Sequence, residues 1–279
     1  YFTSTCGKIY HDGSIKPKDR AAEFNEWGPA PGIGKPAQRI NKLSPPQHPA
    51  MDWGPFPERD EDGGDYKIAT AAIETLQRAP KDKPFFISVG FRLPHVPCFA
   101  PPKWFELYPD ATLQMPPVRP GDRDDTPRFS WYLHWKLPEP RLVTLEKLNE
   151  WRPLVRAYLA SISYMDAQVG RVLDALATEA TVDAKRVALV GHSRLGKTAL
   201  WVGARDPRIA LVFASCSGEM GASLARRDFG ESVDDVAANF PWWLVSTFPK
   251  YAGRWNDLPV DSHTLIALNA PRPVFVTGG

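Results

Sequence analysis

Apolar residues recur at intervals of three and four in two parts of the chain, the spacing that places them on one face of an α-helix. In the stretch "YKIATAAIETLQRA" the shared face carries Ile68, Ala72, Ile73 and Leu76. Between Val155 and Leu176 the corresponding positions are Leu159, Ile162, Met165, Val169, Val172 and Leu176. The stretch "KPFFISVGF" is instead a short apolar run, which is typical of a buried strand. The pattern predicts two amphipathic helices and one strand before residue 178.

After Thr178 short apolar runs alternate with helical patterns. We expect strands at "RVALV", "IALVFAS" and "PVFVTG". We expect helices from Gly196 to Ala204 and at "DSHTLIALN", the second capped by Asp261 or Ser262. Strands that alternate with helices predict a parallel sheet and an α/β fold.

Prolines divide the chain unevenly, because 22 of the 29 fall in the first 150 residues. Proline fixes φ and removes a backbone donor, so we expect mostly irregular structure from Trp27 to Arg59 and from Pro94 to Pro140.

Composition adds few constraints on function. The 279 residues suffice for one large domain or two modest ones. A net charge of +2 gives no reason to expect a nucleic-acid partner, and no apolar run approaches the roughly 20 residues that span a bilayer. The three cysteines, Cys6, Cys98 and Cys216, lack metal-type spacing and indicate neither a zinc site nor a disulfide framework.

The stretch "GHSRLGKTAL" places Ser193 between a predicted strand and a predicted helix. Strand, tight serine turn and helix form a nucleophile elbow, in which the hydroxyl projects over the end of the sheet. The amides at the start of the following helix favour developing negative charge. Leu195 stands where the common elbow has its second glycine. The alternative is that Ser193 only caps the helix.

The segment around this serine closely resembles the glucuronoyl esterase family, whose signature is glycine-x-serine-arginine-x-glycine-lysine. The resemblance continues through "DPRIALVFASCSGEMGASLARRDFGESVDD", "NFPWWLVSTFPKY" and "LPVDSHTLIALNAPRPVFV", and covers roughly residues 180–279. It implies an α/β-hydrolase that cleaves an ester of glucuronic acid. It also implies site roles: Ser193 as nucleophile, Arg194 as oxyanion stabiliser, and Lys197 and Glu231 as sugar-binding groups. For Arg194, Lys197 and Glu231 the alternative is a solvated surface charge.

The triad base and acid of this family are not visible in the sequence. Cys216 stands where many members carry the acid, and a thiol does not orient an imidazole as a carboxylate does. His263 is the only histidine after Ser193, and it is better interpreted as a helix-start residue. His192 adjoins the serine, where backbone geometry normally points the ring elsewhere. We therefore expect the hydrolytic machinery of this chain to be incomplete.

Residues 1–177 resemble a different family, the sulfatases, in the iduronate-2-sulfatase-like branch. The matching stretches are "TCGKIYH", "KPFFISVGFRLPHVPCFAPPKWFELYP" and "YLASISYMDAQVGRVLDAL". The resemblance implies Lys8, His11 and His95 as groups that surround a sulfate, because cations and imidazoles suit an anionic ester. The alternative, which we favour, is that these three residues are vestigial or structural.

The sulfatase resemblance lacks its essential chemistry. The family needs a cysteine in a cysteine-x-proline-serine-arginine context, which becomes formylglycine, and neither Cys6 nor Cys98 has that context. The resemblance would also imply calcium, but the family's paired aspartates are not found in this sequence. Branch members often have lysine where this chain has Leu93. We therefore expect no metal and no cofactor.

Together these observations predict an α/β chain of two parts. Residues 1–177 form a partial sulfatase-like, that is alkaline-phosphatase-like, α/β segment, and residues 178–279 form a partial α/β-hydrolase sheet. The leading functional hypothesis is an esterase-like hydrolase that acts on an acidic polysaccharide or uronic acid ester, with no nucleic-acid or membrane partner. A sulfatase, or an inactive glycan-binding fusion, is the alternative. Secretion is expected only from the resembled families, since no signal-like segment is visible.

Overall fold

The computed structural model of the protein describes residues 1–10, 19–41, 51–118, 121, 124, 127–129, 140–227, 229–240, 243–245 and 247–278. The chain divides into two compact units, unit 1 from Tyr1 to Thr181 and unit 2 from Val182 to Gly279. Both combine helices with parallel strands, which confirms the predicted α/β class.

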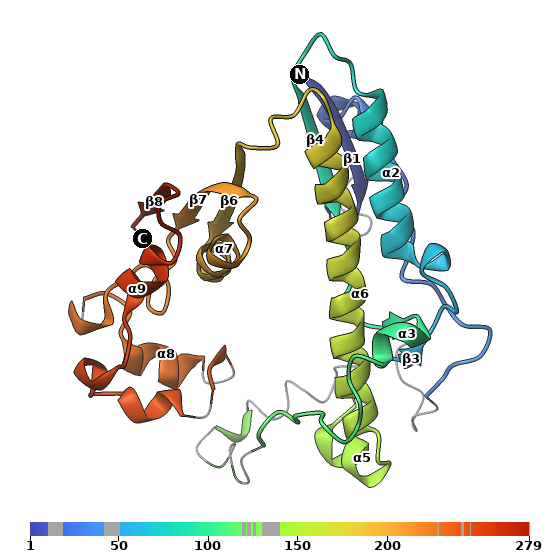
Figure 1. Ribbon diagram of the computed structural model, residues 1–279. Helices are drawn as coiled ribbons and strands as arrows, with labels where there is room; N and C mark the ends of the chain where they lie inside the picture. Colours follow the sequence, from blue (N-terminus) through green and yellow to red (C-terminus); the bar gives the residue numbers. More distant parts are fainter. Residues whose placement is uncertain are drawn as a thin grey trace. The chain divides into compact units, whose positions relative to one another are not determined.

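Unit 1 contains a small parallel sheet in the order β2-β1-β4. The strands are β1 (Phe2–Gly7), β2 (Glu26–Trp27) and β4 (Phe85–Gly90), with α1 (Arg20–Glu23) before β2. Helix α2 (Gly64–Arg78) packs on this sheet and lies beside α6 (Trp151–Thr178) (Figure 1). The contact face of α2 includes Ile68 and Ala72, which are buried against Cys6 of β1. The predicted apolar face of this helix is therefore the one that packs.

A second core in unit 1 surrounds the first half of α6. There β3 (Trp53–Pro55) pairs in parallel with β5 (Cys98–Ala100). Helices α3 (Pro102–Phe105) and α5 (Leu142–Lys147) contribute Phe105 and Leu145 to the same core. Trp53 and Tyr164 are almost fully buried in this core. The Tyr164 hydroxyl donates to the backbone oxygen of Asp60 at 2.9 Å, so the buried ring keeps a partner for its polar end.

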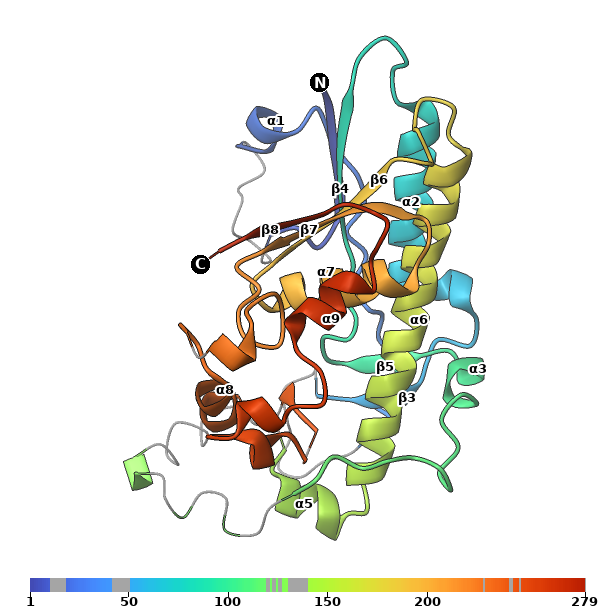
Figure 2. The same cartoon turned by 60° about the vertical axis from the view of Figure 1, so that its left-hand side comes forward.

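Unit 2 is built on a parallel sheet in the order β6-β7-β8. Its strands are β6 (Val187–His192), β7 (Ile209–Ser215) and β8 (Val274–Thr277). Helices α7 (Arg194–Arg205) and α9 (Ser262–Ala267) lie together on one side of this sheet (Figure 2). Their core joins Ala199 and Leu200 of α7 to Ile209, Val212 and Ala214 of β7. Helix α8 (Val233–Asn239) belongs to a separate apolar cluster with Phe248 and Leu258.

Short 3₁₀ helices complete the described secondary structure: η2 (Asp60–Asp62), η4 (Ala225–Arg227), η6 (Phe248–Tyr251) and η7 (Trp255–Asp257). Among the described residues, no helix combines the length and apolar character that crossing a membrane requires.

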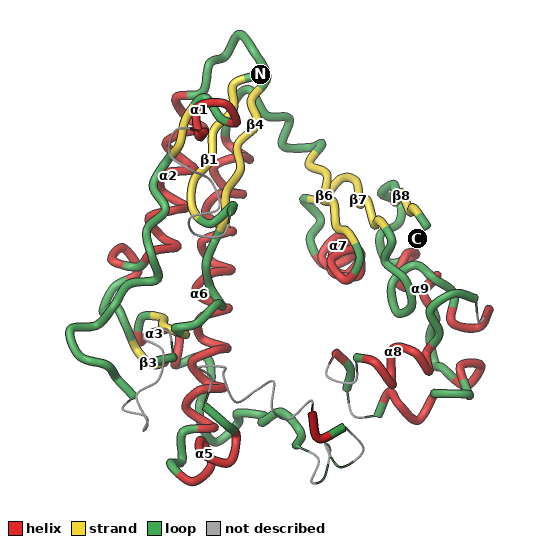
Figure 3. Tube along the Cα trace, turned by 180° about the vertical axis from the view of Figure 1, so that it is seen from behind, coloured by secondary structure: helices red, strands yellow, loops and turns green. Residues whose placement is uncertain are grey.

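Figure 3 draws α7 on one side of the unit 2 sheet and no helix of the described part of this unit on the other side. That other face of the sheet carries an apolar row. The row is defined by register, because Val190 pairs with Phe213 and Phe213 pairs with Phe275. The rings of Phe213 and Phe275 stack at 4.7 Å, yet Val190 stays 67% exposed and Phe275 52% exposed. Parallel sheets are normally covered on both faces, so this row is unusual for the fold.

The periodic segments formed as predicted. The helix predicted at residues 66–79 is α2, and the helix predicted from Val155 begins earlier, at Trp151. The three predicted strands after Thr178 are β6, β7 and β8, and Asp261 is the residue that caps α9. The proline-rich parts are less irregular than expected, since β3, β5 and α3 lie within them.

Candidate functional site

Ser193 occupies the turn between β6 and α7, at the carboxyl end of the sheet. Its backbone has φ 57° and ψ −130°, a conformation that residues other than glycine seldom adopt. Its N–H donates to the oxygen of Ser215 at the end of β7 at 2.9 Å, and its oxygen accepts from the N–H of Gly196 at 2.8 Å. The side chain is exposed and makes no capping hydrogen bond. This is the geometry of a nucleophile elbow rather than of a helix cap.

The two glycines of the motif are required by close packing. A Cβ on Gly191 would lie 2.0 Å from the backbone oxygen of Leu195. A Cβ on Gly196 would lie 2.8 Å from the Cβ of Ser217. Gly196 thus performs the packing role in this turn, and the exposed Leu195 fills a position where a side chain is tolerated.

Arg194 is the first residue of α7 and follows the serine directly. Its side chain is exposed, and the guanidinium lies 5.9 Å from the centre of the Trp243 ring. Trp243 in turn stacks on Phe240 at 4.1 Å. The guanidinium therefore stays accessible beside the elbow while an aromatic ring limits its freedom.

Lys197 lies one turn further along α7 and is half-buried. Its ammonium donates to the backbone oxygen of Ser217. Burial lowers the pKa of Lys197, and the charges of Glu231 and Glu219 oppose that shift. Glu231 Oε2 and Lys197 Nζ both approach Gly218, because a Cβ there would lie 2.9 Å and 3.6 Å from them. The structure thus brings these two predicted residues together.

Sequence reasoning missed Glu219, which is 2% exposed and joins the same cluster of charges. Burial raises the pKa of Glu219 to about 7, and the N–H of Met220 and the ammonium of Lys197 partly oppose the rise. Glutamate is usually exposed, so nothing in the sequence marked this one as buried. The stretch "SGEMG" is a weak signal of a tight loop, since it holds two glycines in five residues.

The remaining polar residues near the elbow do not complete a triad within the described part of unit 2. The His192 ring contacts Ser215 Oγ through Nδ1 at 3.1 Å, and it makes no hydrogen bond to Ser193. Cys216 follows β7 with φ 46°, and its thiol donates to the oxygen of Gly278 at 3.4 Å. His263 is exposed in the first turn of α9, consistent with its interpretation as a helix-start residue.

In unit 1, Lys8 follows β1 and His95 comes shortly after β4, at the same edge of their parallel sheet. The Lys8 N–H donates to the oxygen of Gly90 at 2.7 Å, and His95 is exposed with Nδ1 2.6 Å from the oxygen of Val96. The buried carboxylate of Asp65 accepts from the N–H groups of Arg92 and Leu93, which fixes the loop that leads to His95. His11 lies outside the described residues.

The cysteines of unit 1 are buried and engaged. Cys6 donates to the oxygen of Ile68 and Cys98 to that of Pro94, each at 3.8 Å. Burial raises the pKa of both thiols to about 11, so neither is a thiolate at neutral pH. No group of three or more histidine, cysteine, aspartate or glutamate side chains among the described residues could hold a metal ion, so these residues do not fit the calcium of a sulfatase.

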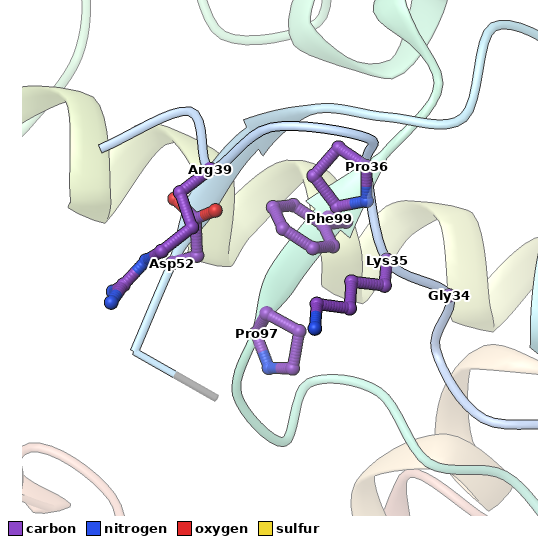
Figure 4. Close-up of a pocket in the computed structure, with 7 residues that line it drawn as sticks. All are labelled: Gly34, Lys35, Pro36, Arg39, Asp52, Pro97 and Phe99. Atoms are coloured by element: carbon purple, nitrogen blue, oxygen red, sulfur yellow. The ribbon is translucent and has the colours of Figure 1, made fainter. Parts of the chain in front are cut away.

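Unit 1 also has a pocket of about 160 Å³ beside the loop that carries His95 (Figure 4). Its lining comprises Gly34, Lys35, Pro36, Arg39, Asp52, Pro97 and Phe99. The Asp52 carboxylate accepts hydrogen bonds from the N–H groups of Ile40, Asn41 and Trp53. Because that carboxylate binds the backbone of its own segment, we assign it a structural role.

Comparison with known families accounts for both units. The family model described as sulfatase matches residues 10–184, which is more than half of the chain. The chain belongs to the sulfatase family. The model described as fungal glucuronyl esterase matches residues 160–279, so the two matches overlap from residue 160 to residue 184. This sulfatase-family chain therefore continues into a segment related to glucuronyl esterases, and the predicted resemblances are confirmed.

The individual relatives include both esterases and a sulfatase. A carbohydrate esterase, MZ0003, from an unknown prokaryotic organism is 51% identical over 104 residues, covering 37% of this chain and 24% of the relative. A sulfatase from Formosa agariphila is 37% identical over 187 residues, covering 63% of this chain and 36% of the relative. The solved glucuronoyl esterase of Solibacter usitatus is 42% identical, covers 42% of this chain and 30% of that one, and has a TM-score of 0.35. The chain thus spans between about a quarter and about a third of the length of these proteins.

Proposed function

We propose that unit 2 supplies the nucleophile and the sugar-binding side of a carboxylic ester hydrolase for glucuronic acid esters. The observation that carries the proposal is Ser193, exposed at a strained turn between β6 and α7 with Arg194 and Lys197 following on the same helix. The similarity of residues 160–279 to glucuronyl esterases supports the ester of glucuronic acid as the substrate class. Such a substrate agrees with an acidic polysaccharide as the larger partner.

The chemistry follows from the positions of the side chains. Ser193 Oγ loses its proton as it attacks the ester carbonyl. The tetrahedral intermediate then expels the alcohol, which takes up a proton, and water hydrolyses the resulting acyl-serine to release the uronic acid. The negative charge that develops on the carbonyl oxygen needs hydrogen-bond donors. The Arg194 guanidinium and the backbone N–H groups at the start of α7 supply them. The base that removes the serine proton is not among the histidine contacts of the described residues, so we assign none.

The sugar side is assigned to Lys197 and Glu231. These two charges meet at Gly218, one turn along α7 from the nucleophile. An ammonium donates three hydrogen bonds and a carboxylate accepts several, a combination that suits the vicinal hydroxyls of a sugar. We propose that they bind the hydroxyls of the glucuronoyl ring while its carbonyl faces Ser193.

A fluorophosphonate that reacts with activated serines tests the nucleophile. We expect peptide mapping to find the label on Ser193 and expect Ser193→Ala to abolish it. The matched control is Ser232→Ala, which removes a hydroxyl from the N-cap of α8 and should leave labelling unchanged. Folded protein that carries no label on Ser193 would refute the nucleophile role.

Sulfatase activity is the second candidate, favoured by the family match over residues 10–184. We propose that Lys8, His11 and His95 are remnants of a sulfate site, since Cys6 and Cys98 are buried and lack the formylglycine context. Release of sulfate from an aryl sulfate in the presence of calcium would favour sulfatase activity over the proposed esterase activity.

We also propose that residues 1–177 and 178–279 are two domains of different ancestry.

A further inference from the structure

Glu219 is a buried acid that the proposed chemistry does not use. It lies in the loop that follows β7, and only 2% of its surface is exposed. One carboxyl oxygen, Oε1, has no hydrogen-bond partner. Burying a carboxyl group with an unsatisfied oxygen costs free energy, so an acid at this position calls for a compensating interaction.

The loop itself holds Glu219 in place. The oxygen of Gly218 accepts from the N–H groups of Gly221 and Ser223, at 3.0 Å and 3.2 Å. A Cβ on Gly221 would lie 2.5 Å from the oxygen of Ser217, so the chain is tightly folded here. The backbone on both sides of Glu219 is consequently fixed, and the N–H of Met220 hydrogen-bonds to its carboxyl group.

Three charged groups act on Glu219. Asp261 and Glu231 raise its pKa and the Lys197 ammonium lowers it. Asp261 is held as a carboxylate, because its side chain accepts hydrogen bonds from the backbone N–H groups of Ala225, Arg226 and Ser262. Lys197 is the cation placed to offset the negative charge of Glu219, because its ammonium donates to the oxygen of Ser217, two residues before Glu219. The same ammonium lies 3.6 Å from the Cβ position of Gly218, the residue before Glu219.

The influence is mutual, because Glu219 also raises the pKa of Lys197, against the lowering caused by burial. A half-buried ammonium that loses its proton also loses a donor and its charge. Coulomb interactions gain strength where water is excluded, so a buried carboxylate acts on this ammonium without a direct hydrogen bond.

We propose that Glu219 is a positioning residue, which keeps Lys197 charged and aimed at the sugar from the buried side while Glu231 faces it from the exposed side. The inference rests on the proposed function for the identity of the ligand. It assigns Glu219 no contact with substrate. Glu219 affects binding of the sugar only through its effect on the Lys197 ammonium.

The first test follows the lysines of the wild-type chain by NMR. Lysines of the whole chain are reductively methylated with ¹³C, and the Lys197 resonance is identified by its loss in Lys197→Arg. Because the pKa of Glu219 is about 7, we expect the Lys197 methyl shift to show an extra inflection near pH 7. Lys185, an exposed lysine in the same unit, should show none. A Lys197 resonance without that inflection would overturn the inference.

The second test uses Glu219→Gln, which removes the charge and keeps the shape. The pKa of Lys197 should fall, and its reactivity toward acetic anhydride at pH 8 should rise about two- to fivefold. Glu219→Asp retains the charge, so the reactivity of Lys197 in this variant should stay close to the wild-type value. Asp183→Asn removes an exposed carboxylate that does not act on Lys197 and should leave the reactivity unchanged.

Titration with methyl glucuronate separates this inference from the proposed function. We expect Glu219→Gln to weaken binding several-fold, with Asp183→Asn as the matched control. If the wild-type chain does not bind methyl glucuronate, the proposed function fails while the coupling of Glu219 to Lys197 stands on the two lysine measurements. If Lys197 reactivity is the same in Glu219→Gln and wild type, the inference fails even where the ligand binds.

Discussion

The backbone of Ser193 carries strain that a chain would not adopt without cause. A non-glycine residue at φ 57° and ψ −130° costs on the order of 1–3 kcal/mol, and such residues cluster at functional sites. The surrounding contacts impose this conformation, since Ser215 and Gly196 hold the peptide groups on both sides of Ser193. The same turn exposes the Ser193 hydroxyl, so the conformation that strains the backbone also makes the side chain accessible.

Replacing Ser193 with glycine should therefore stabilise the protein while it removes the nucleophile. We expect Ser193→Gly to raise the free energy of unfolding by about 1 kcal/mol, because glycine adopts positive φ without steric cost. Ser193→Ala retains a Cβ and should bring no such gain. Urea unfolding of both variants measures the difference. Equal stabilities of the two variants would contradict the strain assigned to this turn.

The helices α7 and α6 determine which of their residues are exposed and which pack against neighbouring elements. On α7, Arg194 and Lys197 are three residues apart and thus on neighbouring positions of one face, while Ala199 and Leu200 turn toward the sheet. In unit 1, the 28 residues of α6 give enough length to pack on α2 and on the β3–β5 pair. Each helix divides its surface between a packing face and an exposed face.

Glycine substitutions test how helix surroundings decide stability. In α6, a Cβ on Gly170 would meet nothing within 4 Å, so Gly170→Ala should stabilise the protein by about 0.5–1 kcal/mol through helix propensity. In α2, a Cβ on Gly64 would lie 2.1 Å from the oxygen of Gly32, so Gly64→Ala should destabilise it. Thermal unfolding measures both. A loss of stability in Gly170→Ala would show that this helix surface is more crowded than described.

At the scale of the whole molecule, the chain consists of two units with different family relationships and separate cores. Unit 2 exposes the apolar row of Val190, Phe213 and Phe275 on one face of its sheet. Exposed apolar surface of this kind marks a place where other groups bind or where chains aggregate. Solution behaviour should therefore depend on this face.

The dye anilinonaphthalene sulfonate, which fluoresces on apolar surface, measures that exposure. We expect the whole chain to bind the dye and expect Phe275→Lys to reduce the fluorescence markedly, because it interrupts the row at its end. Phe229→Lys replaces an exposed ring outside the row and should change the signal little. If the two variants lower fluorescence equally, the row is not the binding surface.

The pattern of apolar residues along the chain predicted most of the regular elements, including the strands that position the Ser193 site. The apolar spacing of α2 and α6 and the runs of β6, β7 and β8 are visible in single segments, because periodicity follows from backbone geometry. Strand β1 escaped prediction since its buried residues include Ser4 and Thr5. Strands β3 and β5 escaped because each has three residues and exists only through pairing with the other.

The sequence by itself determined the α/β class, the elbow around Ser193 and the division into two family segments, because these depend on neighbours along the chain. Tertiary structure alone decided that Glu219 is buried, that Lys197 and Glu231 meet at Gly218, and that Val190 and Phe275 are exposed on one face of the unit 2 sheet. The physical reason is that burial and charge proximity arise between residues distant in sequence. Local patterns carry no record of which segments will fold together.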